Sequence, residues 1–420
     1  MNHDPSCIGF VSTRFAGTDG VSLETEKWAT ILEDMGHRCC YFAGECDRPV
    51  EQCYVVPEAH FSHPRIQALN ADLFNDYVRQ PETSQAVDAI KAEIKEHLYR
   101  FLAGFSPDLL IVENAFAIPM NVPLGLALME VIAETHLPAI GHHHDFAWER
   151  QRFSVSAAQD YLQAAFPPTL PSVRHVTINS AGERQLALRH GVSSTLIPNV
   201  MDFETSPPAP DGYADDLRAE LGISPDAYLI LQPTRIVPRK RIERAIELVR
   251  RLELPAVLLI SHTGGDEGAE YEGYLRDYAA FMGATVIFAG ERINHKRGRT
   301  PEGKKIYSLA DVYQQADLVT YPSAIEGFGN AFLEAIYYRR PIVVQRYAVF
   351  QTDILTKGFR VLHFADYLDA ATVQAVRDLL RNPQAVSAMV DYNYALGKRY
   401  YAYATLKRRL SALLDDALGG

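Results

Sequence analysis

The stretch 321–336 constrains the fold more than any other part of this sequence. The short apolar run 316–321 leads into it and predicts a buried strand, while the spacing of apolar residues over 331–338 predicts a helix. Gly327 and Gly329 mark a turn between the two. A strand, a glycine-containing loop and a helix in this order predict one βα unit of a parallel sheet. Ligands of such sheets collect at the carboxyl ends of the strands, where this loop lies.

The loop carries groups suited to a ligand that is rich in hydroxyl and anionic oxygens. Glu326 can accept hydrogen bonds from a polyol, and Glu334, early in the helix, can accept two from a ribose diol. Four consecutive backbone N–H groups at the helix start can hold anionic oxygens, those of Gly327, Phe328, Gly329 and Asn330. A structural alternative makes Asn330 a helix cap and Glu334 a carboxylate favoured by the helix dipole. Two glycines and a second carboxylate favour the ligand site.

The pattern Glu-Gly-Phe-Gly-Asn followed by Leu-Glu-Ala resembles the signature of retaining GT-B glycosyltransferases, specifically glycosyltransferase family 4. The resemblance implies an α/β GT-B fold, with two Rossmann-like doubly wound domains facing a central cleft. It also implies transfer of a sugar from a nucleotide-diphosphate sugar, with Glu326 on the donor sugar and Glu334 on the ribose. The likeness is tight over 232–344 and loose over 50–107, where acceptors are chosen.

A basic turn in an acidic chain is the second strong signal. The net charge is −11, yet residues 233–241 read Pro-Thr-Arg-Ile-Val-Pro-Arg-Lys-Arg between a predicted strand and a predicted helix. The resemblance assigns Arg235 and Lys240 to the donor diphosphate, for which a planar fork and a movable point charge are suited. A solvated basic turn is the structural alternative. We expect Arg239 and Arg241, which depart from the family's small or acidic residues, to be exposed.

The amino-terminal part opens with a βαβ pattern whose first loop contains Gly17 and Gly20. The third glycine of the dinucleotide fingerprint is missing, so the loop is either a structural turn or a backbone approach to a diphosphate. The resemblance assigns a glycine of this loop to the donor phosphates, with Gly20 preferred over Gly17. The resemblance also places recognition of the nucleotide base at 290–293, ending at Ile293. The polar, basic stretch 294–305 is an insertion relative to a minimal βα turn, and the sequence leaves open whether it forms a mobile loop.

Three consecutive histidines follow another predicted strand. His144, followed by Asp145, resembles the family's amino-domain histidine that reaches the donor sugar; a hydrogen-bonded loop histidine is the alternative. His142 and His144 share a strand face, but no third metal ligand is evident, so we predict no metal and no cofactor beyond the nucleotide-sugar substrate. Asp145, Trp148 and Arg150 are expected beside the acceptor, where an aromatic ring can stack on a sugar.

The acceptor is predicted from arginines at strand ends of the first domain. Arg14, Arg150 and Arg152 suit an anionic group, which favours a small acid, a phosphate ester or a sugar acid, glycerate-type compatible-solute precursors among them. Alternatively, these arginines pair with Asp145, Glu149 or Asp19 and only hold loops. The helix predicted over 83–105 has mixed charges and no basic amphipathic stripe, which favours a soluble acceptor and no stable membrane association.

Composition supports a soluble chain of two domains, since it has 420 residues, 47% hydrophobic and 22% charged. We expect an acceptor-side domain over 1–205, a nucleotide-sugar domain over 206–395 and a helix over 396–420 that crosses back to the first domain. The acidic net charge argues against nucleic acid as a partner. Five cysteines without zinc spacing, and no signal-peptide or membrane-spanning pattern, favour the cytoplasm.

Two rival functions share these features. One is a nucleotide-sugar epimerase of the same architecture, which needs no acceptor. The other is a binding protein that kept the fold and lost turnover, against which the presence of Arg235, Lys240, Glu326 and Glu334 argues. Products made from nucleotide sugars with and without acceptors separate all three. We assign no covalent nucleophile.

Overall fold

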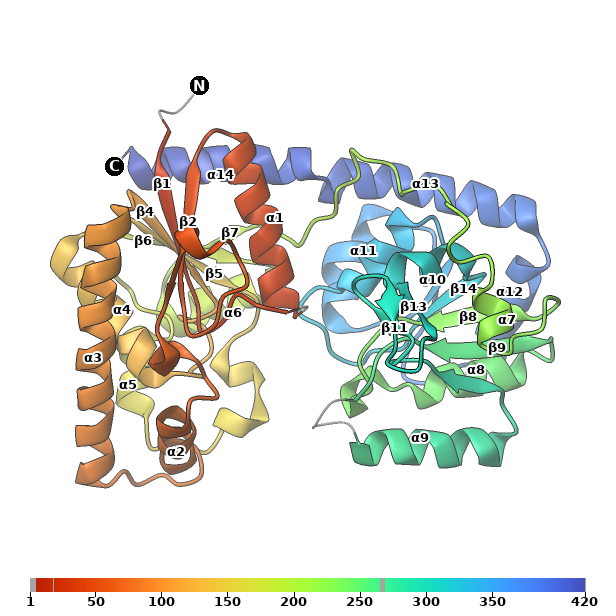
Figure 1. The fold of residues 1–420 in the computed structure, drawn as a ribbon, viewed down its shortest axis with the longest axis horizontal. Helices are drawn as coiled ribbons and strands as arrows, with labels where there is room; N and C mark the ends of the chain where they lie inside the picture. Colours follow the sequence, from red (N-terminus) through yellow and green to blue (C-terminus); the bar gives the residue numbers. More distant parts are fainter. Residues whose placement is uncertain (1–4, 18, 265–268, 420) are drawn as a thin grey trace. The chain divides into compact units, whose positions relative to one another are not determined.

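The computed structural model describes residues 5–17, 19–264 and 269–419. Figure 1 shows two compact α/β units, each built on its own sheet. Unit 1 comprises Met1–Val200 together with Tyr403–Gly420, and unit 2 comprises Met201–Ala402. Both main sheets are parallel throughout, with helices as crossovers, which confirms the Rossmann-like architecture predicted from the sequence. No helix among the described residues combines the length and apolar composition that crossing a membrane requires.

The sheet of unit 1 has the order β3-β2-β1-β4-β5-β6-β7. Its central strands are buried along their whole length, as expected for a parallel sheet covered on both faces. The order of β1, β4 and β5 puts their carboxyl ends side by side at one edge of the sheet. The strands are β1 (Cys7–Val11), β2 (Arg38–Ala43), β3 (Cys53–Val55), β4 (Leu109–Glu113), β5 (Ala139–His143), β6 (Val173–Thr177) and β7 (Thr195–Leu196).

Helices cover the two faces of this sheet with separate apolar cores. One core contains α2 to α5, and the other contains α1 and the last helix, α14, where Leu410 packs in the same cluster as Trp28. The last helix therefore belongs to unit 1, although the chain reaches it from unit 2. The helices are α1 (Gly20–Asp34), α2 (Pro64–Leu73), α3 (Pro81–Phe105), α4 (Val122–Thr135), α5 (Gln159–Ala165), α6 (Ser180–His190) and α14 (Tyr403–Leu418).

The main sheet of unit 2 has the order β10-β9-β8-β14-β15-β16, so β8 and β14 are neighbours at its centre. Its strands are β8 (Tyr228–Gln232), β9 (Ala256–Ile260), β10 (Val286–Phe288), β14 (Leu318–Tyr321), β15 (Ile342–Gln345) and β16 (Leu362–Phe364). Its helices are α7 (Leu217–Glu220), α8 (Glu243–Arg251), α9 (Ala269–Met282), α10 (Leu309–Gln315), α11 (Asn330–Tyr337), α12 (Ala370–Leu380) and α13 (Pro383–Tyr401).

The inserted stretch 294–305 is part of a small sheet. Its strands β11 (Ile293–Asn294), β13 (Lys305–Ser308) and β12 (Gly298–Arg299) pair in that order. Arg297 fixes the segment through ion pairs with Asp211 and Asp311. Polar composition alone suggested a loop because these long-range pairs leave no local signal.

The segment 55–82 contains α2, in which Ile66, Leu69 and Leu73 form a buried stripe at helical spacing. The final stretch 383–418 is helical on both sides of Ala402, which has extended backbone angles between α13 and α14.

Candidate active site

Lys240 and Glu326 meet at the carboxyl ends of β8 and β14 in unit 2. Lys240 closes the short 3₁₀ turn Pro238–Lys240, and Glu326 lies in the loop after β14. The Lys240 ammonium donates to Glu326 Oε1, and both side chains are about nine-tenths buried. Arg239 Nη1 lies 3.3 Å from Glu326 Oε2, so this carboxylate contacts two cations. Arg239 is exposed as predicted, whereas Arg241, also predicted to be exposed, is half-buried. The contact of Arg239 with Glu326 was not predicted.

The charges of this cluster depend on one another. Burial lowers the pKa of the Lys240 ammonium below its ordinary value, and Glu326 offsets only part of that effect. Burial alone would raise the pKa of Glu326, but the charges of Lys240 and Arg239 hold it below its usual range. Burial, with Arg235 and Lys240 nearby, lowers the pKa of His262 to about 4. At neutral pH we therefore expect an ionised Glu326 and a neutral His262.

Arg235 is the cation of this cluster that remains available. It is exposed, and its side chain makes no hydrogen bond or ion pair to any residue that the structure describes. A guanidinium without a carboxylate partner can bind an added anion at both of its edges. We call Arg235, Arg239, Lys240, His262 and Glu326 the cationic cluster.

The glycine loop between Glu326 and α11 is held in a backbone conformation that requires glycine. Gly329 has φ +127°, and a Cβ at this position would collide with the hydroxyl oxygen of Tyr347. That hydroxyl donates to the carbonyl of Phe328 over 2.7 Å. The Phe328 ring is buried edge-to-face against Tyr401, so only its backbone remains for a ligand. Gly327 and Asn330 lie on either side, at the start of α11.

Glu334 lies one turn into α11 and is half-buried. It accepts a hydrogen bond of 2.8 Å from the Tyr313 hydroxyl. Burial, together with the charge of Glu334, raises the pKa of Tyr313 well above its ordinary value, so the phenol remains a donor. Ile293, expected at the base-reading position, lies in β11 and is 7% exposed. Unit 2 thus gathers Arg235, Lys240 and Glu326, while Ile293 belongs to the small sheet.

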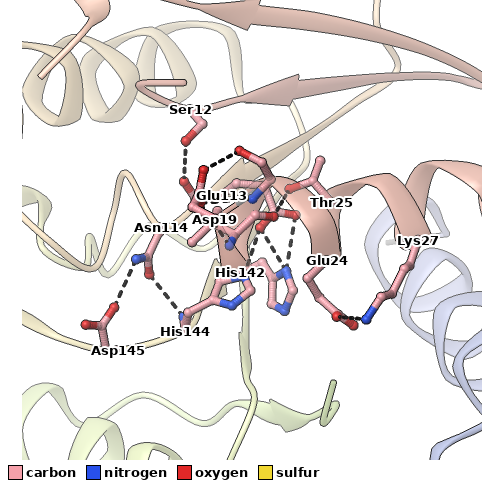
Figure 2. Close-up of polar contacts among 12 residues, drawn as sticks. Ser12, Asp19, Glu24, Thr25, Lys27, Glu113, Asn114, His142, His144 and Asp145 are labelled. Atoms are coloured by element: carbon pink, nitrogen blue, oxygen red, sulfur yellow. Dashed lines mark hydrogen bonds and ion pairs between the residues drawn. The ribbon is translucent and has the colours of Figure 1, made fainter. Parts of the chain in front are cut away.

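In unit 1, Glu113 joins His142 and His144 into a buried carboxylate–histidine cluster. Glu113 ends β4 and pairs in register with His142 near the end of β5. His142 Nδ1 lies 3.1 and 2.9 Å from the two carboxylate oxygens, and His144 Nε2 lies 3.3 Å from Oε2. Figure 2 shows both rings pointing toward the carboxylate. Trp28 stacks on the His142 ring at 4.1 Å between centroids.

The cluster holds one negative charge between two imidazoles. Burial alone would raise the pKa of Glu113, but His142 and His144 outweigh it and hold that pKa at about 2. Burial lowers the pKa of His142 despite Glu113. Burial also opposes charge on His144, yet its hydrogen bond to Glu113 and the nearby negative charges raise its pKa. These shifts favour an ionised Glu113, a neutral His142 and a His144 that holds its proton more strongly than a free imidazole.

Glu113 is also a third potential metal ligand, one that was not evident from the sequence. With His142 and His144 it forms the one group of at least three such residues found in the part of the chain that the structure describes, with ligating atoms within 4.8 Å of one another. Separations of 2.9 to 3.3 Å between the carboxylate and both ring nitrogens are those of direct hydrogen bonds. We therefore interpret the group as hydrogen-bonded.

The predicted acceptor residues of unit 1 are tied to neighbouring loops. Arg14 pairs with Asp19 at 2.9 Å, and Arg150 pairs with Asp145 at 2.5 Å. These are pairings that the structural alternative expected. Asn114 joins Asp145 to the cluster, since its amide donates to Asp145 and accepts from the backbone N–H of His144 (Figure 2).

Trp148 does not lie open to a ligand on both faces. Its ring stacks on Phe146 at 4.4 Å and on His190 at 5.5 Å, with the Arg189 guanidinium 5.1 Å from the ring centroid. These contacts pack Trp148 against α6, which limits the sugar stacking expected from the sequence.

The first loop of unit 1 places its two candidate glycines differently. Gly17 is exposed with φ +80°, and its N–H donates to Asp47 over 3.0 Å. Gly20 is the first residue of α1. Asp19 caps this helix by accepting from the N–H groups of Val21 and Ser22, so its carboxylate stands where an anionic ligand would bind.

Three residues of these clusters were missed in the sequence: Glu113, His262 and Arg239. A usable signal existed for Glu113, because it is a carboxylate that ends an apolar strand at its carboxyl end, where ligands of parallel sheets bind. His262 follows β9 in the same way. Arg239 gave no such signal, since a basic turn is usually solvated.

Two parallel-sheet units, one with a cationic cluster and a glycine loop before a helix, make up a GT-B fold. The family description "Glycosyl transferases group 1" matches residues 214–396. Mannosylglucosylglycerate synthase from Thermotoga maritima is 30% identical over 437 residues, covering 96% of this chain and 98% of that protein. The enzyme of the same name from Petrotoga mobilis is 32% identical over 386 residues, covering 84% and 86%.

A solved structure with the same fold is sucrose-phosphate synthase from Thermosynechococcus elongatus, with a TM-score of 0.67, 15% identity and 99% of each chain covered. The chain belongs to the group 1 glycosyl transferases, as the likeness over almost its whole length shows.

Proposed function

We propose that this glycosyltransferase moves a sugar from a nucleotide-diphosphate sugar, linked to UDP, GDP or ADP, onto a small glycerate-type acceptor. The observation that carries the proposal is the pair of cations at the end of β8. Arg235 is exposed and unpaired among the described residues, and Lys240 is buried beside Glu326. Fixed positive charge of this kind stabilises the negative charge that develops on a leaving diphosphate.

The acceptor class is carried over from the two synthases reported above. Their name describes a product built from mannosyl, glucosyl and glycerate groups. For this chain we propose glucosylglycerate or glycerate as acceptor and a hexosyl group as the sugar transferred. A glycerate carboxylate also agrees with the anionic acceptor predicted from the sequence, although Arg14 and Arg150 are each paired with an aspartate in this structure.

The residues of unit 2 supply the roles that a retaining, metal-independent transfer needs. Arg235 and Lys240 bind the diphosphate, Glu326 accepts a hydrogen bond from a sugar hydroxyl, and Glu334 accepts from the ribose diol. We assign no covalent nucleophile. The acceptor oxygen attacks from the face that the diphosphate leaves; the sugar–phosphate C–O bond breaks, the new C–O bond forms, and a donor phosphate oxygen takes the acceptor proton.

The test is a transfer assay with matched acceptors. Glucosylglycerate and glycerate are compared with glucosylglycerol and glycerol, which carry a hydroxymethyl group in place of the carboxylate. Products are read by mass spectrometry and by NMR of the anomeric centre. We expect products from the acids, the donor's anomeric configuration retained, and full activity in EDTA. Preference for the neutral alcohols would refute the acceptor class. An inverted anomer, or a loss in EDTA that added metal restores, would refute the mechanism.

A further inference from the structure

The carboxylate–histidine cluster determines which nitrogen of His144 is available to a ligand. His144 Nε2 is 3.3 Å from Glu113 Oε2, and the ring is 9% exposed. No hydrogen-bond partner of Nδ1 is found among the residues that the structure describes. An ionised carboxylate only accepts hydrogen bonds, so Nε2 must carry a proton. A neutral His144 would then present a bare Nδ1 that accepts, and a charged His144 would present an Nδ1–H that donates.

The groups around His144 favour the charged form. Three carboxylates face it from different parts of unit 1: Glu113 from β4, Glu24 from α1 and Asp145 from the residue that follows it. The neighbouring imidazoles are those of His142 and His143, and burial lowers the pKa of both, so they add little charge at neutral pH. Arg150 is paired with Asp145. Lys27 is already paired with Glu24, as Figure 2 shows.

We propose that Glu113 is a positioning residue which binds His144 through Nε2 and thereby leaves Nδ1–H as a hydrogen-bond donor for an oxygen of the substrate. The same carboxylate orients His142, whose Nδ1–H donates to it, and the Trp28 ring stacks on the His142 ring. His144 in this form cannot act as a general base, because both nitrogens carry protons. It suits an anionic or hydroxyl oxygen, which agrees with leaving the acceptor proton to a donor phosphate.

The role of Glu113 in turnover rests on the proposed sugar transfer, but the protonation of His144 does not. The primary test is therefore NMR of the full chain labelled with ¹⁵N-histidine, without substrates, over a range of pH. The His144 signals are assigned by their loss in His144→Gln. In the wild type we expect Nε2 to stay protonated and His144 to titrate above its ordinary value of about 6.5.

Glu113→Gln removes the charge and keeps the size of the side chain. We expect the His144 titration to move down by about one pH unit or more, which is a tenfold change in its protonation constant. We expect Glu113→Asp to retain most of the wild-type titration. In turnover, the pH at which kcat/KM falls on the alkaline side should move with the titration. Binding of UDP, GDP or ADP should be unchanged.

The matched control is His143→Gln. His143 follows His142 on β5, is as fully buried as Glu113, and contacts His175 rather than Glu113. A merely structural role predicts that both Gln variants lose stability and neither moves the titration of His144. An unchanged titration in Glu113→Gln, or a wild-type midpoint at or below 6.5, would overturn the proposal, as would a stoichiometric metal ion held by these rings. If Glu113→Gln does not fold, the His144 titrations of the wild type and of Glu113→Asp still test the proposal.

Failure of the proposed function gives a different result. A chain that transfers no sugar but shows the raised His144 titration refutes the transferase proposal and leaves the protonation assignment standing. A chain that transfers sugar but shows no raised His144 titration refutes the protonation assignment and leaves the transferase proposal standing.

Discussion

Removing one partner of the Lys240–Glu326 pair should destabilise unit 2. Both side chains are 10% exposed, so each has lost most of its hydration. Stripping one member from a buried ion pair costs about 3–5 kcal/mol. Arg239 remains 3.3 Å from Glu326 Oε2 after Lys240→Met, so we expect a smaller loss, about 1–3 kcal/mol. For a unit of this size that corresponds to about 2–12 °C in Tm.

The assay is a double-mutant cycle read by calorimetry without ligand. It compares the wild type, Lys240→Met, Glu326→Gln and the double variant. The unfolding transition of unit 2 is identified beforehand as the one whose midpoint rises when a nucleotide diphosphate is added. Glu326→Gln removes the carboxylate partner of the buried Lys240 ammonium, and Lys240→Met leaves Glu326 with Arg239 alone. The double variant should therefore be more stable than the sum of the singles predicts, by about 1–3 kcal/mol. Effects that add to within about 0.5 kcal/mol would refute the coupling.

The coupling should also depend on pH with a defined sign. The pKa of Glu326 is lowered in the folded state, so its ionised form stabilises the fold above the unfolded pKa of about 4.3. That contribution disappears as the pH falls through the lower folded value. We therefore expect the full coupling at pH 6–8 and a decline below about pH 4.

Three further variants test other parts of the account. Gly329→Ala should weaken nucleotide diphosphate binding, measured by calorimetry, and the added change Tyr347→Phe should recover part of it by removing the colliding oxygen; normal binding by Gly329→Ala would show that the loop tolerates a side chain. Leu410→Ala should cost about 2–5 kcal/mol in chemical unfolding, because its fully buried side chain packs in one core of unit 1; a loss near zero would mean that α14 is not part of that core. Glu334→Ala should raise the donor's dissociation constant with little change in kcat, whereas Glu326→Gln should lower kcat with little change in binding; the opposite pattern would exchange their roles.

The sequence predicted the elements around the cationic cluster because their signals are local. An apolar run, two glycines and a helical apolar spacing place Glu326 in a loop after a buried strand, and the structure has β14, the loop and α11 there. Arg235 and Lys240 follow β8 for the same reason. Such patterns report what neighbours in the chain do, which is enough to build each βα unit.

The contacts that the sequence did not predict depend on the register between elements. Glu113 meets His142 because β4 and β5 pair with those two residues opposite each other, and no property of either strand alone determines that register. Arg239 reaches Glu326 across adjacent strands in the same way. The small sheet at 293–308 depends on two ion pairs of Arg297. Its partner Asp211 is 86 residues away in the sequence, and its partner Asp311 lies on α10.

The central claim is that this chain releases a nucleoside diphosphate from its sugar through Arg235 and Lys240. The most direct measurement is the rate of diphosphate release and product formation, with glucosylglycerate and each of the UDP, GDP and ADP sugars, in the wild type, Arg235→Ala and Lys240→Ala. We predict that the wild type uses one of the three donors and forms equal amounts of nucleoside diphosphate and glycosylated product. Each variant should be about tenfold to a thousandfold slower. No product from any donor, or variants as fast as the wild type, would contradict it.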